Sequence, residues 1–222
     1  MFEDMIFVHS RVVCRALFTL LCGVCLALPP AGLRAAPGKP VEPPNIPEEL
    51  LLPKEAPDGV ADRKELLGEL YLRLKKTEDA DSAGLVASAI EKLWQRSGSD
   101  TVDLLMNRVS MLMEGKELDI ALQLLNSVTE IAPDYSEGWN LRAAILFVKK
   151  DFGKSLESLR HALALDPSHY KAIHGLGLLM QELGDKKAAL KAFRHALRVH
   201  PHLEDARQSE RELSREVEGR GI

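Results

Sequence analysis

Apolar residues recur at intervals of three and four from residue 62 onward, which is the spacing that places side chains on one face of an α-helix. Residues 62–76 carry such a face, made of Leu66, Leu67, Leu70, Tyr71 and Leu74. Residues 80–97 carry a second one, made of Val86, Ile90, Leu93 and Trp94. The pattern therefore predicts a pair of amphipathic helices over residues 62–98.

Three prolines mark a repeat in the rest of the chain. Pro133, Pro167 and Pro201 are each thirty-four residues apart, and self-similarity at a fixed period of this length is typical of stacked helical repeats. Alignment on these prolines gives units over residues 102–135, 136–169 and 170–203. Each unit contains two series of apolar positions and so predicts two helices joined by a turn. Because one hairpin cannot bury its apolar faces alone, we expect the units to stack.

Small residues occur where the paired helices of a unit must approach closely. They are Gly177, Ala143, Ala189, Ser155, Ala196 and Ala162, with Phe193, Leu159 and Leu125 beside them. Glycine inside a helix costs about 1 kcal/mol relative to alanine. Its presence at position 177 therefore indicates a steric demand, and we expect a larger residue there to disrupt the packing.

The last unit resembles the tetratricopeptide repeat (TPR), through Leu176, Gly177, Ala189, Phe193, Ala196 and Pro201. The middle unit keeps Trp139, Ala162 and Pro167 but has Arg142 and Ser155 where the family prefers Leu and Ala. The first unit is degenerate: it keeps Ala121 and Pro133, while Arg108 and Val109 depart from the pattern.

The resemblance covers about 102 of the 222 residues. It implies an all-α, right-handed solenoid of antiparallel helix hairpins with about three TPR units. Within that fold, residues 62–98 are interpreted as an N-terminal cap or a decayed fourth unit. Residues 204–218 are predicted to form a polar capping helix, since terminal repeats need a soluble outer face.

The first thirty-five residues are typical of an export signal. Arg11 and Arg15 precede thirteen apolar or small residues from Ala16 to Leu28, which is short of the roughly 20 needed to span a bilayer. Small residues and prolines follow, and we expect cleavage near Ala35. An uncleaved membrane anchor is the alternative, and either Met1 or Met5 could be the initiator.

Residues 36–61 are predicted to be an extended, disordered linker, which serves as a passive spacer or, alternatively, as a docking strip for a proline-binding module. Seven of the twelve prolines of the chain lie between Pro37 and Pro57, and proline removes backbone donors and fixes φ. All three cysteines lie at positions 14, 22 and 25. The cleaved chain would therefore contain no thiol, which suits an oxidising compartment. Together with the repeat, this organisation resembles small exported TPR proteins of the Gram-negative envelope, and we expect a periplasmic location.

Charge and motifs argue against several functions. The formal net charge is -4 and the pI is near 6.0, which does not favour a nucleic-acid binder. The candidate metal ligands are histidines at 161, 169, 174, 195, 200 and 202, but duplication and exposure explain His161 and His195, and His200 and His202 flank a proline. We expect no metal site, no cofactor and no catalytic activity, because no phosphate loop or hydrolase motif occurs.

The first helix of each unit is expected to line a concave groove that holds a peptide or a partner helix. The groove candidates are Met106, Ser110, Met113, Glu137, Asn140, Ala144, Phe147, Lys171, His174, Leu178 and Gln181. Phe147 is the candidate anchor; the alternative is that it packs under the turn at 149–153. Arg108 and Arg142 share one slot, where a guanidinium would pair with a carboxylate of the chain or of a ligand. The alternative is that the aliphatic part of the side chain covers apolar surface while the charge reaches solvent. Some family members bind carboxylate termini through paired Lys and Asn, a combination that is missing here.

These features predict an exported, non-catalytic adaptor that binds an unidentified protein or peptide. They predict no nucleic-acid partner, and a membrane contact only if the leader is uncleaved. The alternative is a structural module that assembles into homo-oligomers through its stacked ends.

Overall fold

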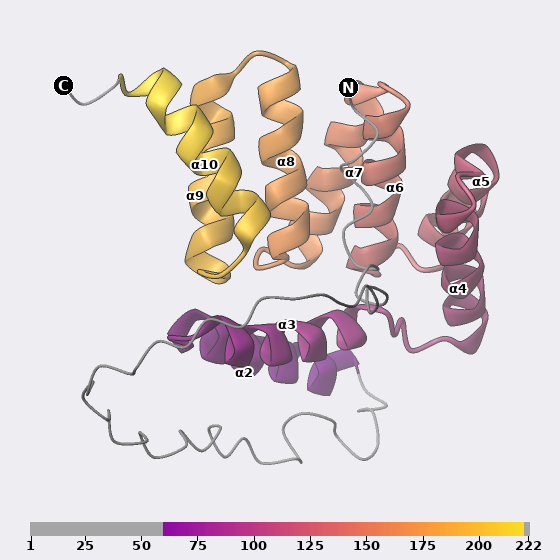
Figure 1. Cartoon of the computed structure of the whole chain (residues 1–222). Helices are drawn as coiled ribbons and strands as arrows, with labels where there is room; N and C mark the ends of the chain where they lie inside the picture. Colours follow the sequence, from indigo (N-terminus) through magenta and orange to yellow (C-terminus); the bar gives the residue numbers. More distant parts are fainter. Residues whose placement is uncertain (1–59, 220–222) are drawn as a thin grey trace, which may run out of the picture. The chain divides into compact units, whose positions relative to one another are not determined.

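The computed structural model describes residues 60–219, in which short turns join successive helices (Figure 1). The predicted signal and residues 36–59 of the predicted linker lie outside the described residues. The helices are α2 (Val60–Lys76), α3 (Ala80–Trp94), α4 (Asp100–Glu114), α5 (Leu118–Ile131), α6 (Ser136–Val148), α7 (Phe152–Leu165), α8 (Tyr170–Glu182), α9 (Lys186–Val199) and α10 (Glu204–Val217).

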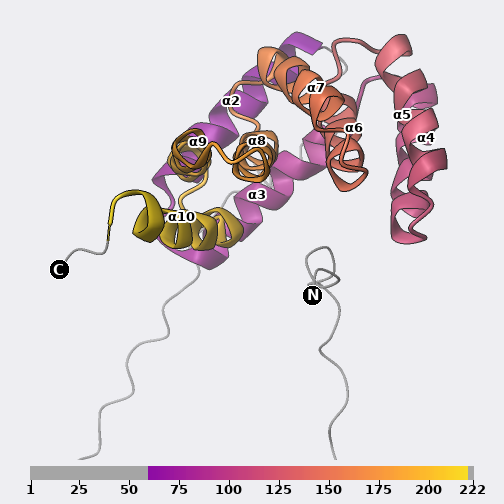
Figure 2. The same ribbon diagram turned by 90° about the horizontal axis from the view of Figure 1, so that it is seen from above.

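The expected all-α solenoid of antiparallel hairpins is confirmed. The helices pair as α4–α5, α6–α7 and α8–α9, one pair for each predicted unit, and neighbouring pairs pack side by side (Figure 2). The turn inside each unit places one residue in the left-handed region, at Lys116, Lys150 and Gly184, with φ of 60°, 61° and 82°. Aspartates then cap the second helices of the last two units, where Asp151 and Asp185 accept hydrogen bonds from the backbone N–H groups of Lys154 and Ala188.

Close approach inside the hairpins depends on the small residues. A Cβ atom added at Gly177 would lie 2.4 Å from the ring of Phe193, which is fully buried. In the middle unit the buried Ser155 hydroxyl donates a 2.9 Å hydrogen bond to the Ala143 carbonyl. The serine therefore occupies the small-residue slot and also satisfies its own polar atom.

The α2–α3 hairpin lies across the turns that join successive units (Figure 1). It contacts turn positions that are thirty-four residues apart: Tyr135 donates a 2.6 Å hydrogen bond to the Trp94 carbonyl, His169 stacks on Trp94, and Leu203 packs against the hairpin core. Tyr170, Val199 and buried residues of both hairpin helices complete this core.

This position differs from the predicted cap or fourth unit. A cap would cover the outer face of α4, whereas Trp94, Leu93 and Ile90 of α3 pack with Tyr170 of the third unit. The physical reason is that aromatic rings from the turns supply the apolar partner for α3, so the hairpin folds back along the stack.

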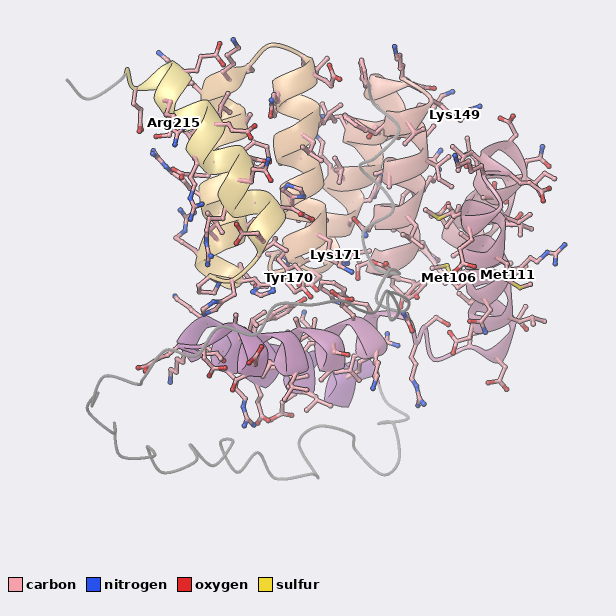
Figure 3. The ribbon with its side chains drawn as sticks, viewed as in Figure 1. Met106, Met111, Lys149, Tyr170, Lys171 and Arg215 are labelled. Atoms are coloured by element: carbon pink, nitrogen blue, oxygen red, sulfur yellow. The ribbon has the colours of Figure 1, made fainter. Side chains whose placement is uncertain are left out.

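The C-terminal helix α10 packs on α9. Its Ala206 and Leu213 are buried, and its outward side chains are charged, including Arg215 (Figure 3). Arg194 of α9 binds two glutamates of this C-terminal segment, with Nε 2.9 Å from Glu210 and Nη1 2.7 Å from Glu218. The helix thus gives the last unit a polar outer surface.

Candidate peptide-binding face

The first helices α4, α6 and α8 present the face predicted to bind a partner, and the hairpin occupies one end of it. Lys171, at the start of α8, forms an ion pair with Glu91 of α3 at 2.9 Å, and its ammonium group lies 6.0 Å from the centre of the Trp94 ring (Figure 3). The Tyr170 hydroxyl also donates to Glu91, at 2.9 Å. Lys171 is therefore engaged within the chain.

Glu137, at the start of α6, belongs to a buried polar network. The Nε2 atom of His169 lies 2.9 Å from its carboxylate, and the Asn140 side chain donates to the same oxygen at 3.0 Å. The Nδ1 atom of His169 accepts the Ala172 backbone N–H, so the geometry assigns the ring proton to Nε2. The His169 ring stacks on Trp94 with 3.8 Å between centroids. These contacts hold the hairpin against the stack. The polar atoms that make them have their hydrogen-bond partners within the chain.

The next slot along the first helices is largely buried. Met106 is 6% exposed and belongs to the core between the first two units, and Asn140 is 8% exposed. Both were predicted to face a partner, and for both the prediction is wrong, because neighbouring side chains close over this slot. His174 is half-buried beside the Phe193 ring, and burial lowers its pKa, against a smaller opposing effect of Asp205.

The distal part of this face is open. Ser110, Ala144 and Gln181 are exposed, while Met113, Phe147 and Leu178 are half-buried. Val148, which the sequence analysis missed, has 47% of its surface exposed at the end of α6. Its position next to Phe147 in an apolar run could have indicated it.

Phe147 lies near the turn that follows α6. Its ring centroid is 5.8 Å from that of Phe152 across this turn. The contact matches the alternative interpretation, in which Phe147 packs under the turn, although the side chain remains partly exposed.

The two arginines of the shared slot have different surroundings. The Arg142 Nε donates to the Asn126 Oδ1 of the preceding unit at 2.8 Å, and its Nη1 donates to the Ser158 hydroxyl at 2.6 Å. These partners are neutral, so the expected carboxylate is absent from the contacts of Arg142. Arg108 is exposed on α4.

The described residues also enclose cavities outside this face, of which two are relevant here. One, of about 350 Å³, lies beside the contacts between the hairpin and the turns. Its lining includes Trp94, Tyr71 and Asp166, which are joined by hydrogen bonds from Trp94 Nε1 to the Tyr71 hydroxyl and from that hydroxyl to Asp166. Burial, followed by the Asp166 charge, raises the pKa of Tyr71. The other cavity, of about 380 Å³, is apolar, and Leu163, Leu176 and Met180 contribute to its lining.

We expect the buried His200 to make the stability of the protein sensitive to acid. Burial, followed by the charge of His202, lowers the pKa of His200 from 6.5 to about 4, and its edge contacts Tyr170. Because the folded protein disfavours the charged ring, the stabilisation is complete above pH 6.5 and is lost as the pH falls towards 4.

We expect the free energy of unfolding to drop by about 3 kcal/mol as the pH falls from 6.5 to 4. Chemical denaturation at several pH values would measure this. The loss should shrink in His200→Gln and persist in the exposed control His161→Gln; an unchanged profile in His200→Gln would contradict this assignment.

Among residues 60–219, no group of three or more His, Cys, Asp or Glu side chains is placed to hold a metal ion. Within the same range, every helix is too short or too polar to span a bilayer.

The fold and the open first-helix face define a helical-repeat protein of the kind that binds other proteins. Residues 170–202 match the tetratricopeptide repeat family model. A TPR repeat-containing protein of Rhizobium etli is 32% identical over 156 residues, which cover 70% of this chain and 76% of that protein. The chain belongs to the tetratricopeptide repeat family.

Solved structures share the fold over about half of the chain. The Sgt2 TPR domain from Aspergillus fumigatus superimposes with a TM-score of 0.51 at 24% identity, covering 54% of this chain and 81% of that one. The first TPR domain of Spaghetti (RPAP3), bound to the HSP90 peptide SRMEEVD, gives a TM-score of 0.51 at 20% identity, covering 53% of this chain and 94% of that one. TPR domains are protein-interaction modules, and typically they are non-catalytic.

Proposed function

We propose that the protein is an exported, non-catalytic adaptor of the bacterial envelope that binds a peptide or partner helix on the distal first-helix face. The observation that carries this proposal is the apolar surface at the end of α6, where Ala144 and Val148 are exposed and Phe147 is partly exposed; Gln181 is exposed at the equivalent position of α8. Apolar side chains that stay accessible on a folded repeat are candidate contacts for an apolar side chain of a partner, and the amide of Gln181 can bind a nearby polar group. The solved relative with a bound HSP90 peptide supports a peptide as the class of ligand.

Contacts near the hairpin support a ligand position away from it. Glu137 and Lys171 are engaged by His169 and by α3, and Asn140 is buried. The partner would therefore contact the ends of α4, α6 and α8 that are distant from the hairpin. Binding there would not require the network around His169 to open.

The envelope location rests on the leader pattern in residues 1–35 and on the confinement of all three cysteines to it. Osmotic-shock fractionation with intact-mass analysis tests this part of the proposal. We expect a periplasmic species beginning near Ala36, whereas a cytoplasmic species that keeps residues 1–30 would contradict it.

Val148→Glu should abolish partner binding without unfolding the protein. The side chain is 47% exposed, so a carboxylate there stays solvated in the free protein but is desolvated against an apolar ligand. The measurement is chemical cross-linking followed by affinity isolation from periplasmic extract, with melting temperatures of each variant. Leu85→Glu is the matched control, because Leu85 is 51% exposed on the hairpin helix α3. Loss of the same partner from both variants, or from neither, would overturn the assignment.

A further inference from the structure

The outer face of α4 carries an exposed stripe made of Leu104, Asn107, Arg108 and Met111, here called the α4 stripe. Leu104 is 70% exposed and Met111 is 61% exposed, and their spacing of seven residues places both on one face of the helix. Met111 points away from the stack, while Met106 of the same helix points towards α6 (Figure 3).

The equivalent positions in the second and third units indicate which kind of surface normally covers this stripe. Thirty-four residues after Leu104 and Met111 lie Gly138 and Ile145, and both are buried. A Cβ atom at Gly138 would lie 2.9 Å from Val128 of α5, so this slot is pressed against the second helix of the preceding unit. The same two slots in the third unit hold Ala172 and Leu179, each 0% exposed. The α4 stripe is thus the surface that a preceding unit would cover.

The hairpin that precedes α4 in the sequence does not cover it. α3 instead packs with Tyr170 of the third unit, and its Trp94 stacks on His169. Leu104 and Met111 therefore remain exposed among the described residues.

We propose that a second copy of this chain covers the α4 stripe, in a two-fold dimer with the two α4 helices antiparallel. If the axis passes between Asn107 and Arg108, Leu104 of one copy faces Met111 of the other, and Arg108 faces Asn107. In this arrangement the apolar ends of one stripe contact the apolar ends of the other, and the two polar centres meet. A two-fold interface requires such self-complementarity, because the same surface of each copy forms both sides.

The polar centre repeats a contact that the stack already makes. Arg142, in the slot of Arg108, reaches the preceding unit through a 2.8 Å hydrogen bond to the side-chain oxygen of Asn126. In the dimer, Asn107 of the second copy supplies the equivalent amide oxygen to Arg108. A hydrogen bond of this kind compensates the guanidinium for the water that it loses.

A head-to-tail chain of copies is disfavoured by the other end of the stack. There, α10 covers α9 and presents charged side chains such as Arg211, Glu212 and Arg215 to solvent. An apolar stripe would gain little against that surface. One helix packed on one helix buries less than the roughly 1,600 Å² of a standard interface, so we expect reversible dimers with a dissociation constant in the micromolar range.

Sedimentation velocity over a concentration series of the chain, purified as it accumulates in cells, tests the proposal. We expect a monomer–dimer equilibrium, weakened at least tenfold by Leu104→Glu or Met111→Glu and unchanged by Leu72→Glu. Leu72 is the matched control, because it is 62% exposed on α2. A monomer at all concentrations would overturn the proposal, as would a dimer that survives Leu104→Glu with unchanged affinity.

Oxidation of Met111 by peroxide gives a second readout. The dimer predicts slower oxidation as the protein concentration rises, because the partner copy shields the thioether. A monomer whose Met111 resists peroxide would instead assign the stripe to a segment of the same chain and contradict the dimer. The dimer proposal does not depend on the peptide-binding face. Peptide binding by a strictly monomeric chain would therefore contradict the dimer and leave the proposed function unaffected.

Discussion

We expect the Gly177→Leu variant to unfold at a markedly lower temperature than the unmodified protein. Even the first side-chain carbon would lie 2.4 Å from the Phe193 ring, which is fully buried between α8 and α9 and cannot turn away into solvent. Overpacking typically costs about 1–3 kcal/mol, and this site should lie at the top of that range. At about 2–4 °C per kcal/mol for a chain of this size, the melting temperature should fall by roughly 6–12 °C.

The matched control is the change of glycine to alanine at two helical positions. Gly177→Ala should destabilise the protein because of the Phe193 contact. Gly84→Ala, on the exposed side of α3 with no atom within 4 Å of the added carbon, should stabilise it by about 0.5–1 kcal/mol through helix propensity. Differential scanning calorimetry would measure the change in melting temperature of both alanine variants. Shifts of the same sign would show that position 177 has no steric role.

The Trp94→Ala variant should lose about 3–5 kcal/mol of stability. Trp94 is 3% exposed, stacks on His169 and donates a 3.0 Å hydrogen bond to the Tyr71 hydroxyl. Removing the ring takes away the central contact between the hairpin and the turn that joins the second and third units. The expected result is undocking of α2 and α3 and faster amide hydrogen exchange in both helices, measured by mass spectrometry.

Trp139→Ala is the control for this prediction. That ring is half-buried, stacks on the exposed His161 at 4.3 Å and donates to the Pro133 carbonyl at 2.9 Å. Its loss should cost less and should leave exchange in α2 and α3 unchanged. Equal destabilisation by the two substitutions would contradict the central role of Trp94 in docking.

The stack itself could be predicted from the sequence, because each unit contains its own evidence. The proline period fixes the register, and the small residues Gly177 and Ser155 fall where the paired helices meet. Within one hairpin the partner of each apolar face is local, so periodicity is sufficient to assign it.

The position of the α2–α3 hairpin could not be predicted in the same way. Periodicity identified the apolar face of α3 but not its partner, which includes Tyr170, seventy-six residues after Trp94. The sequence did contain a signal: Tyr135, His169 and Tyr170 put aromatic rings where the turns between units meet the first helices, and a solvated loop would not require rings there. The helical phase likewise predicted which face of the helix carries Met106 and Asn140. It could not predict that neighbouring side chains bury both residues on that face.

The central claim is that the protein binds a partner through the distal first-helix face, and site-specific photo-cross-linking in cells tests it most directly. A photoreactive residue would replace Ala144 on α6 in one variant and Ser88 on α3 in another, since both positions are exposed. We predict a discrete adduct with another protein from position 144 and none from position 88. Adducts from position 88 alone, or none from position 144 in a correctly folded and exported variant, would contradict the account.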